Sequence, residues 1–180
     1  MIDIINSQII KYNPNSFRQP DNAIKETIYN ILKENVNNKN LYLIGGEMIF
    51  FDKLLNSINL QNIIMYTDFL SIYQDALINI NINYNINYNI NLINYENDKL
   101  QNPPNDNYTL IINTSKQGLG YNLSNQISKM NFNQIIIISC NKKSFNKDFN
   151  ILHNFYKLLK TYDITTNYSV TLYFLIKTDI

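Results

Sequence analysis

Strand-like and helix-like segments alternate along most of this 180-residue chain, and that alternation limits its fold more than any other feature. Short apolar runs predict strands, whereas apolar residues three and four positions apart predict helices. Strands are expected at 41–44, 63–66, 88–95, 109–112, 134–139, near 162 and at 171–176, and helices at 21–36, 48–58, 70–78, 121–130 and 145–159. This pattern predicts one α/β domain over 1–180, with a mostly parallel seven-stranded sheet and helices on both faces.

Composition excludes several broad classes of function. The formal net charge of +1 gives no overall field that attracts nucleic acid or membrane, so RNA binding would need a local patch. A single cysteine, Cys140, excludes an intrachain disulfide and argues against a cysteine-based zinc site. We expect no metal and no membrane span, and an intracellular, reducing compartment: cytoplasm, a viral factory or an organelle matrix. The excess of Asn and Ile, which have AT-rich codons, indicates an AT-rich genome.

Cys140 directly follows the isoleucine-rich strand predicted at 134–139. The carboxyl ends of parallel strands are where α/β proteins build their sites, and a thiol there can act as a nucleophile. Most free cysteines are instead small buried apolar residues. Position alone leaves both interpretations open.

Four segments occur in the order and spacing of one family's motifs. They read NPNSFRQPDN from residue 13, LYLIGGEMIF from 41, YTDFLSIYQDA from 66, and IINTSKQGL from 111 followed by SCNKKSFNKD from 139. Over roughly 12–176 they resemble the catalytic domain of the RNA (uracil-5)-methyltransferases, S-adenosylmethionine-dependent enzymes of tRNA and rRNA. The most specific part is the joint match of Gly118-Leu119, Ser139-Cys140-Asn141 and Asp148.

The resemblance implies a Rossmann-like class I methyltransferase fold and a set of cofactor-binding residues. These are Gln19, Gly46, Asp68 and Asn113, the last standing where the family has an aspartate. Three of them have a structural alternative: Gln19 precedes a helix cap, Gly46 can serve a turn, and Asp68 can cap the next helix. S-adenosylmethionine is expected if the chain is active, and otherwise no cofactor.

In the family mechanism a cysteine thiolate adds to carbon 6 of uracil, and carbon 5 then takes the methyl group. A carboxylate removes the carbon-5 proton, and the cysteine is eliminated. Cys140 would be this nucleophile. A basic cluster beside it is suited to RNA phosphates, although a solvated helix start explains it equally well. The cluster comprises Lys116, Lys142, Lys143 and Lys147.

Several positions depart from the family pattern. The family's base is a glutamate just before the last strand, but no acidic residue lies between Asp163 and Asp179, so Asp163 is the one candidate substitute. General-base catalysis typically contributes ~100- to 10,000-fold. Tyr42 and Met48 replace an acid and a glycine, and are expected to place bulky side chains in the cofactor space. The only histidine, His153, is expected at the surface.

We interpret the chain as a methyltransferase-like domain that is catalytically degenerate and acts as a structural or RNA-associated subunit of a larger complex. The alternative is an active minimal RNA methyltransferase that uses Cys140. A nucleotide-binding regulator without RNA has only the fold in its favour. The family's N-terminal OB-type RNA-binding domain has no counterpart in 1–180, so RNA capture is expected from a protein partner.

Overall fold

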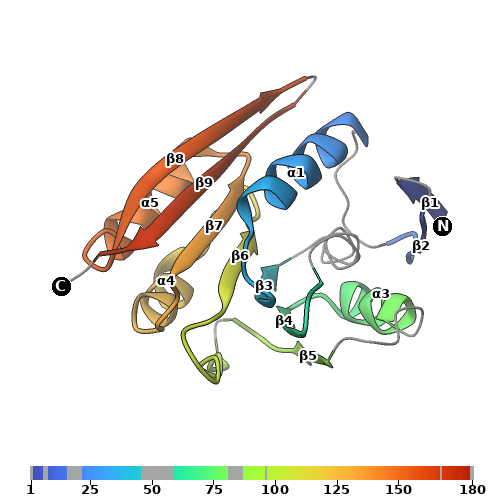
Figure 1. Ribbon diagram of the computed structural model, residues 1–180, viewed down its shortest axis with the longest axis horizontal. Coiled ribbons are helices and arrows are strands. Elements are labelled where there is room, and N and C mark those ends of the chain that lie inside the picture. The colour runs from blue at the N-terminus through green and yellow to red at the C-terminus, as the bar shows by residue number, and fades with distance from the viewer. Residues whose placement is uncertain are drawn as a thin grey trace.

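Seven strands form one mixed sheet in a computed structural model that describes residues 2–5, 8–15, 22–45, 59–80, 87–95, 97–166 and 168–178. In spatial order they are β5 (Asn87–Leu92), β4 (Asn62–Thr67), β3 (Asn40–Gly45), β6 (Thr109–Asn113), β7 (Gln134–Ser139), β9 (Ser169–Lys177) and β8 (Tyr156–Thr165). The strands from β5 to β7 are parallel, and β9 runs antiparallel to both its neighbours (Figure 1). The seven-stranded, mostly parallel sheet is confirmed.

Helices cover both faces of this sheet. On one face lie α1 (Asn22–Asn35) and α3 (Leu70–Ile80), and on the other α4 (Gly120–Ser128) and α5 (Lys142–Leu152). Along β7, Ile136 and Ile138 pack toward α1, whereas Ile135 and Ile137 pack toward α4 and α5. Because successive side chains of a strand point to opposite faces, this uninterrupted isoleucine run reflects a strand that is buried on both sides.

The helix predicted over 145–159 is wrong at both ends. Asn141 caps α5, which starts three residues earlier and stops at Leu152, and the chain then forms β8. Tyr156 fixes this change, since its buried hydroxyl donates to Met130 O at 2.8 Å and accepts from Phe132 N at 3.3 Å. Leu158 and Leu159 therefore lie in a strand paired with β9, although their spacing also fits a helix.

The amino-terminal segment forms a hairpin that the sequence pattern did not predict. β1 (Ile2–Ile5) and β2 (Gln8–Lys11) pair antiparallel in a separate two-stranded sheet beside α3 (Figure 1). Asn79 of α3 donates to Lys11 O at 2.7 Å and accepts from its N at 3.2 Å. Strands of four residues are too short to show a periodic pattern. The helix expected at 48–58 lies outside the described residues.

The strand order reverses between β3 and β6, and this switch point sets the place of a ligand crevice. In open α/β sheets ligands bind outside the carboxyl ends of the strands at such a point. Gly45 ends β3 in register with Asn113, which ends β6. Gly45 has φ +102°, and a Cβ there would lie 2.2 Å from Asn113 O. The close approach of these two strands therefore requires glycine at Gly45.

Candidate functional site at the carboxyl edge of the sheet

Three of the predicted site residues share the edge at which β3 to β7 end, here called the carboxyl edge. Asp68 follows β4, Asn113 ends β6, and Cys140 directly follows β7. Neighbouring strands lie roughly 4.8 Å apart, so Asp68 and Cys140 are separated by three spacings, or about 14 Å. The structure thus brings these residues to one edge, while Gln19 and Gly46 fall outside the described residues.

A hollow of about 560 Å³ lies beside Asp68, and we call it the Asp68 hollow. Its lining residues come from the segments that follow β4 and β5: Asp68, Leu70, Leu92, Ile93, Asn94 and Tyr95. Partial burial raises the pKa of the Asp68 carboxyl, although a hydrogen bond from its own backbone opposes this shift. Asp68 was also a candidate cap of α3, but the side chain that accepts the Phe69 N–H there is Thr67, through Oγ1 at 3.2 Å. The hollow combines a carboxylate, an amide and a phenol with three aliphatic side chains.

Tyr95 links the Asp68 hollow to the switch point. Its hydroxyl accepts from Gly45 N at 3.1 Å and donates to Tyr66 O at 2.7 Å, so the side chain reaches from β5 across β4 to β3. Burial raises the pKa of Tyr95, the negative charge of Asp68 raises it further, and the Gly45 N–H opposes the shift. The Gly45 amide therefore already has an acceptor within the protein.

Tyr42 does not block the cofactor space as the sequence comparison predicted. Its side chain is fully buried, stacked on Tyr66 at 5.3 Å between ring centroids and edge-on to Phe132 at 5.2 Å. The hydroxyl donates to Gln101 O at 2.8 Å. Because residue 42 points into the core under α4 and α5, the aromatic replacement fills the core. Met48 lies outside the described residues.

Cys140 is exposed, and the loops after β6 and β7 are tied together beside it. Asn141 caps α5 by accepting Lys143 N at 3.0 Å, and its amide donates to Lys116 O at 2.9 Å. Ser144 donates to the same carbonyl at 2.6 Å. The thiol therefore sits on a backbone that is braced from two neighbouring strands.

The four predicted phosphate-binding lysines are exposed around this braced segment. Three occupy the amino-terminal half of α5, and the fourth belongs to the loop after β6: Lys142, Lys143, Lys147 and Lys116. Residues four apart on a helix share a face, which places Lys143 and Lys147 together. The structure thus gathers positive charge beside the exposed thiol.

A buried carboxylate clamps the loop between β6 and α4. Asp148, which is 3 % exposed, accepts from Leu119 N at 2.8 Å, Gly120 N at 3.2 Å and Ser124 Oγ at 3.4 Å. Burial raises the pKa of Asp148, while these donors and Lys147 oppose the shift. A Cβ on Gly118 would lie 2.5 Å from Asp148 Oδ2. Gly118-Leu119 and Asp148, which matched the family motif together, are thus in direct contact. The sequence pattern alone did not predict this contact.

Asp163 and His153 both lie at a distance from Cys140. Thr171 of β9 is in register with Ser139 and donates to Asp163 Oδ1 of β8 at 2.6 Å. Asp163 is therefore two strand spacings, roughly 10 Å, from Ser139 on the same face. His153 is exposed at the far end of the 11-residue α5, about 16 Å along its axis, which confirms its surface position.

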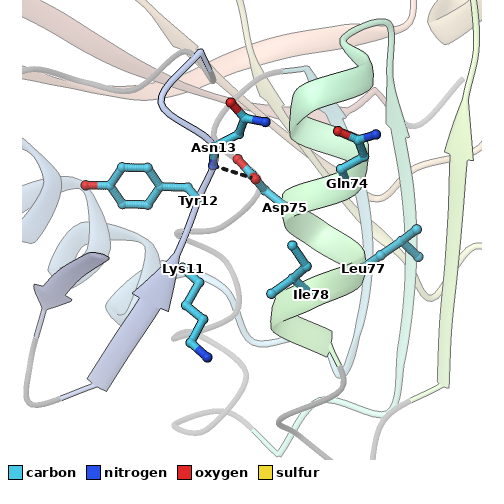
Figure 2. Close-up of a pocket in the computed structure, with 7 residues that line it drawn as sticks. All are labelled: Lys11, Tyr12, Asn13, Gln74, Asp75, Leu77 and Ile78. Carbon is cyan, nitrogen blue, oxygen red and sulfur yellow. Dashed lines mark hydrogen bonds between the residues drawn. The ribbon is translucent and has the colours of Figure 1, made fainter. Parts of the chain in front are cut away.

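A second hollow of about 600 Å³ lies between the end of β2 and α3. Figure 2 shows the Asp75 carboxylate turned toward Asn13, whose N–H it accepts at 2.7 Å, and the Tyr12 ring pointing away from α3. Asp75 is 1 % exposed. This hydrogen bond joins the segment after β2 to α3.

Two kinds of site are not found in the described part of the chain. Within those ranges no three His, Cys, Asp or Glu side chains are grouped so that they could hold a metal ion. None of the helices described there is both long enough and apolar enough to span a membrane.

No family model and no curated protein matches the chain, but solved structures share its fold. The tRNA (uracil-54, C5)-methyltransferase of Pyrococcus abyssi, in complex with S-adenosyl-L-homocysteine, superposes with a TM-score of 0.81 at 17% identity, over 98% of this chain and 44% of that one. The N-methyltransferase NodS of Bradyrhizobium japonicum, also with S-adenosyl-L-homocysteine, gives 0.67 at 10%, over 92% and 90%. The tRNA methyltransferase TrmK of B. subtilis gives 0.60 at 11%, over 84% and 65%. The chain therefore has the class I methyltransferase fold and spans less than half the length of the Pyrococcus enzyme.

Proposed function

We propose that the chain is an RNA uracil-5 methyltransferase-like domain that no longer completes its reaction and serves as an RNA-associated subunit. The observation that carries this proposal is the side chain that β9 places beside Ser139. It is the hydroxyl of Thr171, where a carboxylate would be needed to take the carbon-5 proton. Two acids near this edge have hydrogen-bond donors: Asp163 accepts from Thr171, and Asp148 accepts from the loop before α4.

The RNA association rests on the surface around Cys140. Four exposed lysines surround an exposed thiol on a braced backbone, and phosphates are contacted by such side chains. Two of the proteins that share the fold are tRNA methyltransferases by name. A protein partner is proposed to supply further RNA contacts, because a formal net charge of +1 gives the chain no overall field that attracts nucleic acid.

The alternative is an active minimal methyltransferase, and one observation favours it. Asp163 lies on the same edge and the same face as Ser139, so its carboxylate is the available replacement for the missing base. In that case Cys140 adds to the uracil ring, and the carbon-5 proton passes to Asp163 before the thiol leaves. The thiol and the carboxylate then have separate roles, which substitution separates.

The RNA-associated part is tested by reversing two charges on α5. Lys143→Glu/Lys147→Glu is expected to weaken binding of single-stranded RNA about tenfold or more. The slope of log affinity against log salt should also fall, by about 1.4 for two lost phosphate contacts. Fluorescence anisotropy with a labelled uridine-containing RNA measures both quantities.

The matched control is Lys33→Glu/Lys39→Glu, which makes the same charge change at two exposed positions away from Cys140. Lys33 lies in α1 on the opposite face of the sheet, and Lys39 directly precedes β3 at the amino edge. An equal loss in both double variants would show that only net charge matters, and would contradict a phosphate-binding surface beside Cys140.

A further inference from the structure

Exposed aromatic rings gather at the carboxyl edge. In the described part of the chain four Phe and Tyr side chains are exposed, and three of them lie at this edge: Tyr121 (78%), Tyr168 (55%) and Phe69 (52%). The fourth, Phe155 (40%), directly precedes β8 at the amino edge. Single exposed apolar residues are ordinary. Rings gathered at one edge beside exposed lysines indicate instead a ligand that carries both flat and anionic groups.

Tyr121 and Tyr168 lie on two sides of Cys140. Tyr121 is in the first turn of α4, which follows β6, and Tyr168 directly precedes β9. In the sheet β7, which ends just before Cys140, lies between β6 and β9. Because Thr171 is in register with Ser139, Tyr168 projects about 10 Å past the end of β7 (Figure 1). The turn before β9 therefore stands beside the exposed thiol.

We propose that Tyr121 and Tyr168 stack unpaired bases of an RNA strand, one on each side of Cys140, so that this edge binds single-stranded RNA. The inference rests on the proposed function and deepens it, because it names the form of RNA that the subunit holds. Aromatic rings stack on bases of any identity, while lysines contact the phosphates. Bases inside a duplex are stacked on one another and do not reach such rings.

The backbone holds both rings in place before RNA binds. The amides of the two residues before Tyr121 donate to the buried Asp148 at 2.8 and 3.2 Å. At the other ring, Thr166 N donates to Tyr168 O at 3.0 Å, which joins the end of β8 to the start of β9. A ring on a fixed backbone has only its two side-chain torsions to order, so stacking costs little conformational entropy.

The lysines between the rings supply the contacts to phosphate. Lys116 precedes α4 by four residues, and its carbonyl accepts from Asn141 and Ser144, which brings this loop against the start of α5. Lysine contacts to phosphate are independent of sequence and occur in single strands and duplexes alike. A preference for unpaired RNA must therefore come from the rings, which makes the two contributions separable.

The experiment compares a short labelled oligouridine with the same strand annealed to oligoadenosine, by fluorescence anisotropy with the full chain. Tyr121→Leu and Tyr168→Leu should each weaken binding of the single strand about fivefold or more, as expected for one lost stacking contact. Binding of the duplex and the slope of log affinity against log salt should stay unchanged, because leucine removes no charge. Tyr121→Trp and Tyr168→Trp keep a ring and should retain the wild-type affinity.

Phe155→Leu is the matched control, because it removes an exposed ring at the amino edge and should leave RNA binding unchanged. Equal losses for single strand and duplex, or an equal loss in Phe155→Leu, would overturn the stacking. Unchanged binding in both leucine variants, with a loss in Lys143→Glu/Lys147→Glu, would also overturn it and leave the phosphate-binding surface intact. Absence of binding of either RNA by the wild-type chain would overturn both the stacking and the RNA association on which it rests.

Discussion

Replacing Gly45 by alanine is expected to lower the free energy of unfolding by about 3 kcal/mol or more. Alanine at φ +102° carries backbone strain of roughly 1–3 kcal/mol, and overpacking in a filled interior typically adds about 1–3 kcal/mol. The new Cβ would meet Asn113 O at 2.2 Å, and a backbone atom in the middle of a sheet cannot rotate aside. Urea denaturation followed by circular dichroism measures the change.

Gly120→Ala is the matched control. Gly120 also has a positive φ, +75°, but a Cβ there meets nothing within 4 Å, so only backbone strain of about 1–2 kcal/mol is expected. Equal losses in the two variants would contradict a role for Gly45 in the packing of β3 against β6. A larger loss at Gly45 would assign this glycine to the sheet rather than to a ligand.

Replacing Gly118 by alanine is expected to cost about 2 kcal/mol or more and to release the loop before α4. The residue has φ +85°, and the added Cβ would lie 2.5 Å from Asp148 Oδ2. It would push this carboxylate away from the Leu119 amide, which donates to Oδ2, and from the Gly120 amide, which donates to Oδ1. Strain and a lost charge-assisted hydrogen bond each contribute about 1–3 kcal/mol. Unfolding measurements and the rate of proteolysis within 114–120 report the two effects.

A double-mutant cycle separates the strain from the clamp. Asp148→Ala should itself destabilise the protein, and Gly118→Ala should cost at least about 1 kcal/mol less in that background, because residues in contact are not additive. Additive losses would show that the two residues act independently, and the motif match would then have no common structural cause.

Strands that are buried on both faces of the sheet were predictable, because every position in them must be apolar. The isoleucine run of β7 and the apolar run of β6 are enclosed on both faces, so composition alone marks them as strands. The end of α5 was not predictable, because Leu158 and Leu159 fit a helix as well as the edge strand β8. What decides is the buried Tyr156 hydroxyl, which bonds to Met130 and Phe132.

Some residues of the candidate site were predictable from the sequence and others were not. Asp68, Asn113 and Cys140 could be placed on one edge because each ends or directly follows a predicted strand. Tyr95 could not be found, since its bond to Gly45 joins residues 50 positions apart and depends on β5 lying beside β4. The prediction that Tyr42 fills the cofactor space was wrong, because a strand side chain points to one face of the sheet only. The side chain of Tyr42 points into the core beneath α4 and α5.

Methyl transfer to RNA tests most directly whether Cys140 marks a site that no longer completes uracil methylation. The full chain, in excess over a uridine-containing transfer RNA transcript and with S-adenosylmethionine present, is followed by mass spectrometry of the released nucleosides. A parallel reaction uses 5-fluorouridine RNA, which has no carbon-5 proton to lose and therefore requires the thiol and the methyl donor but no base. Because the account places the defect at the missing base, it predicts no 5-methyluridine above the level of Cys140→Ser, whereas an adduct on 5-fluorouridine RNA that depends on Cys140 would show that the thiol and the methyl donor still act. Formation of 5-methyluridine that disappears in Cys140→Ser would contradict the account, and loss of product with retention of the 5-fluorouridine adduct in Asp163→Asn would identify Asp163 as the base.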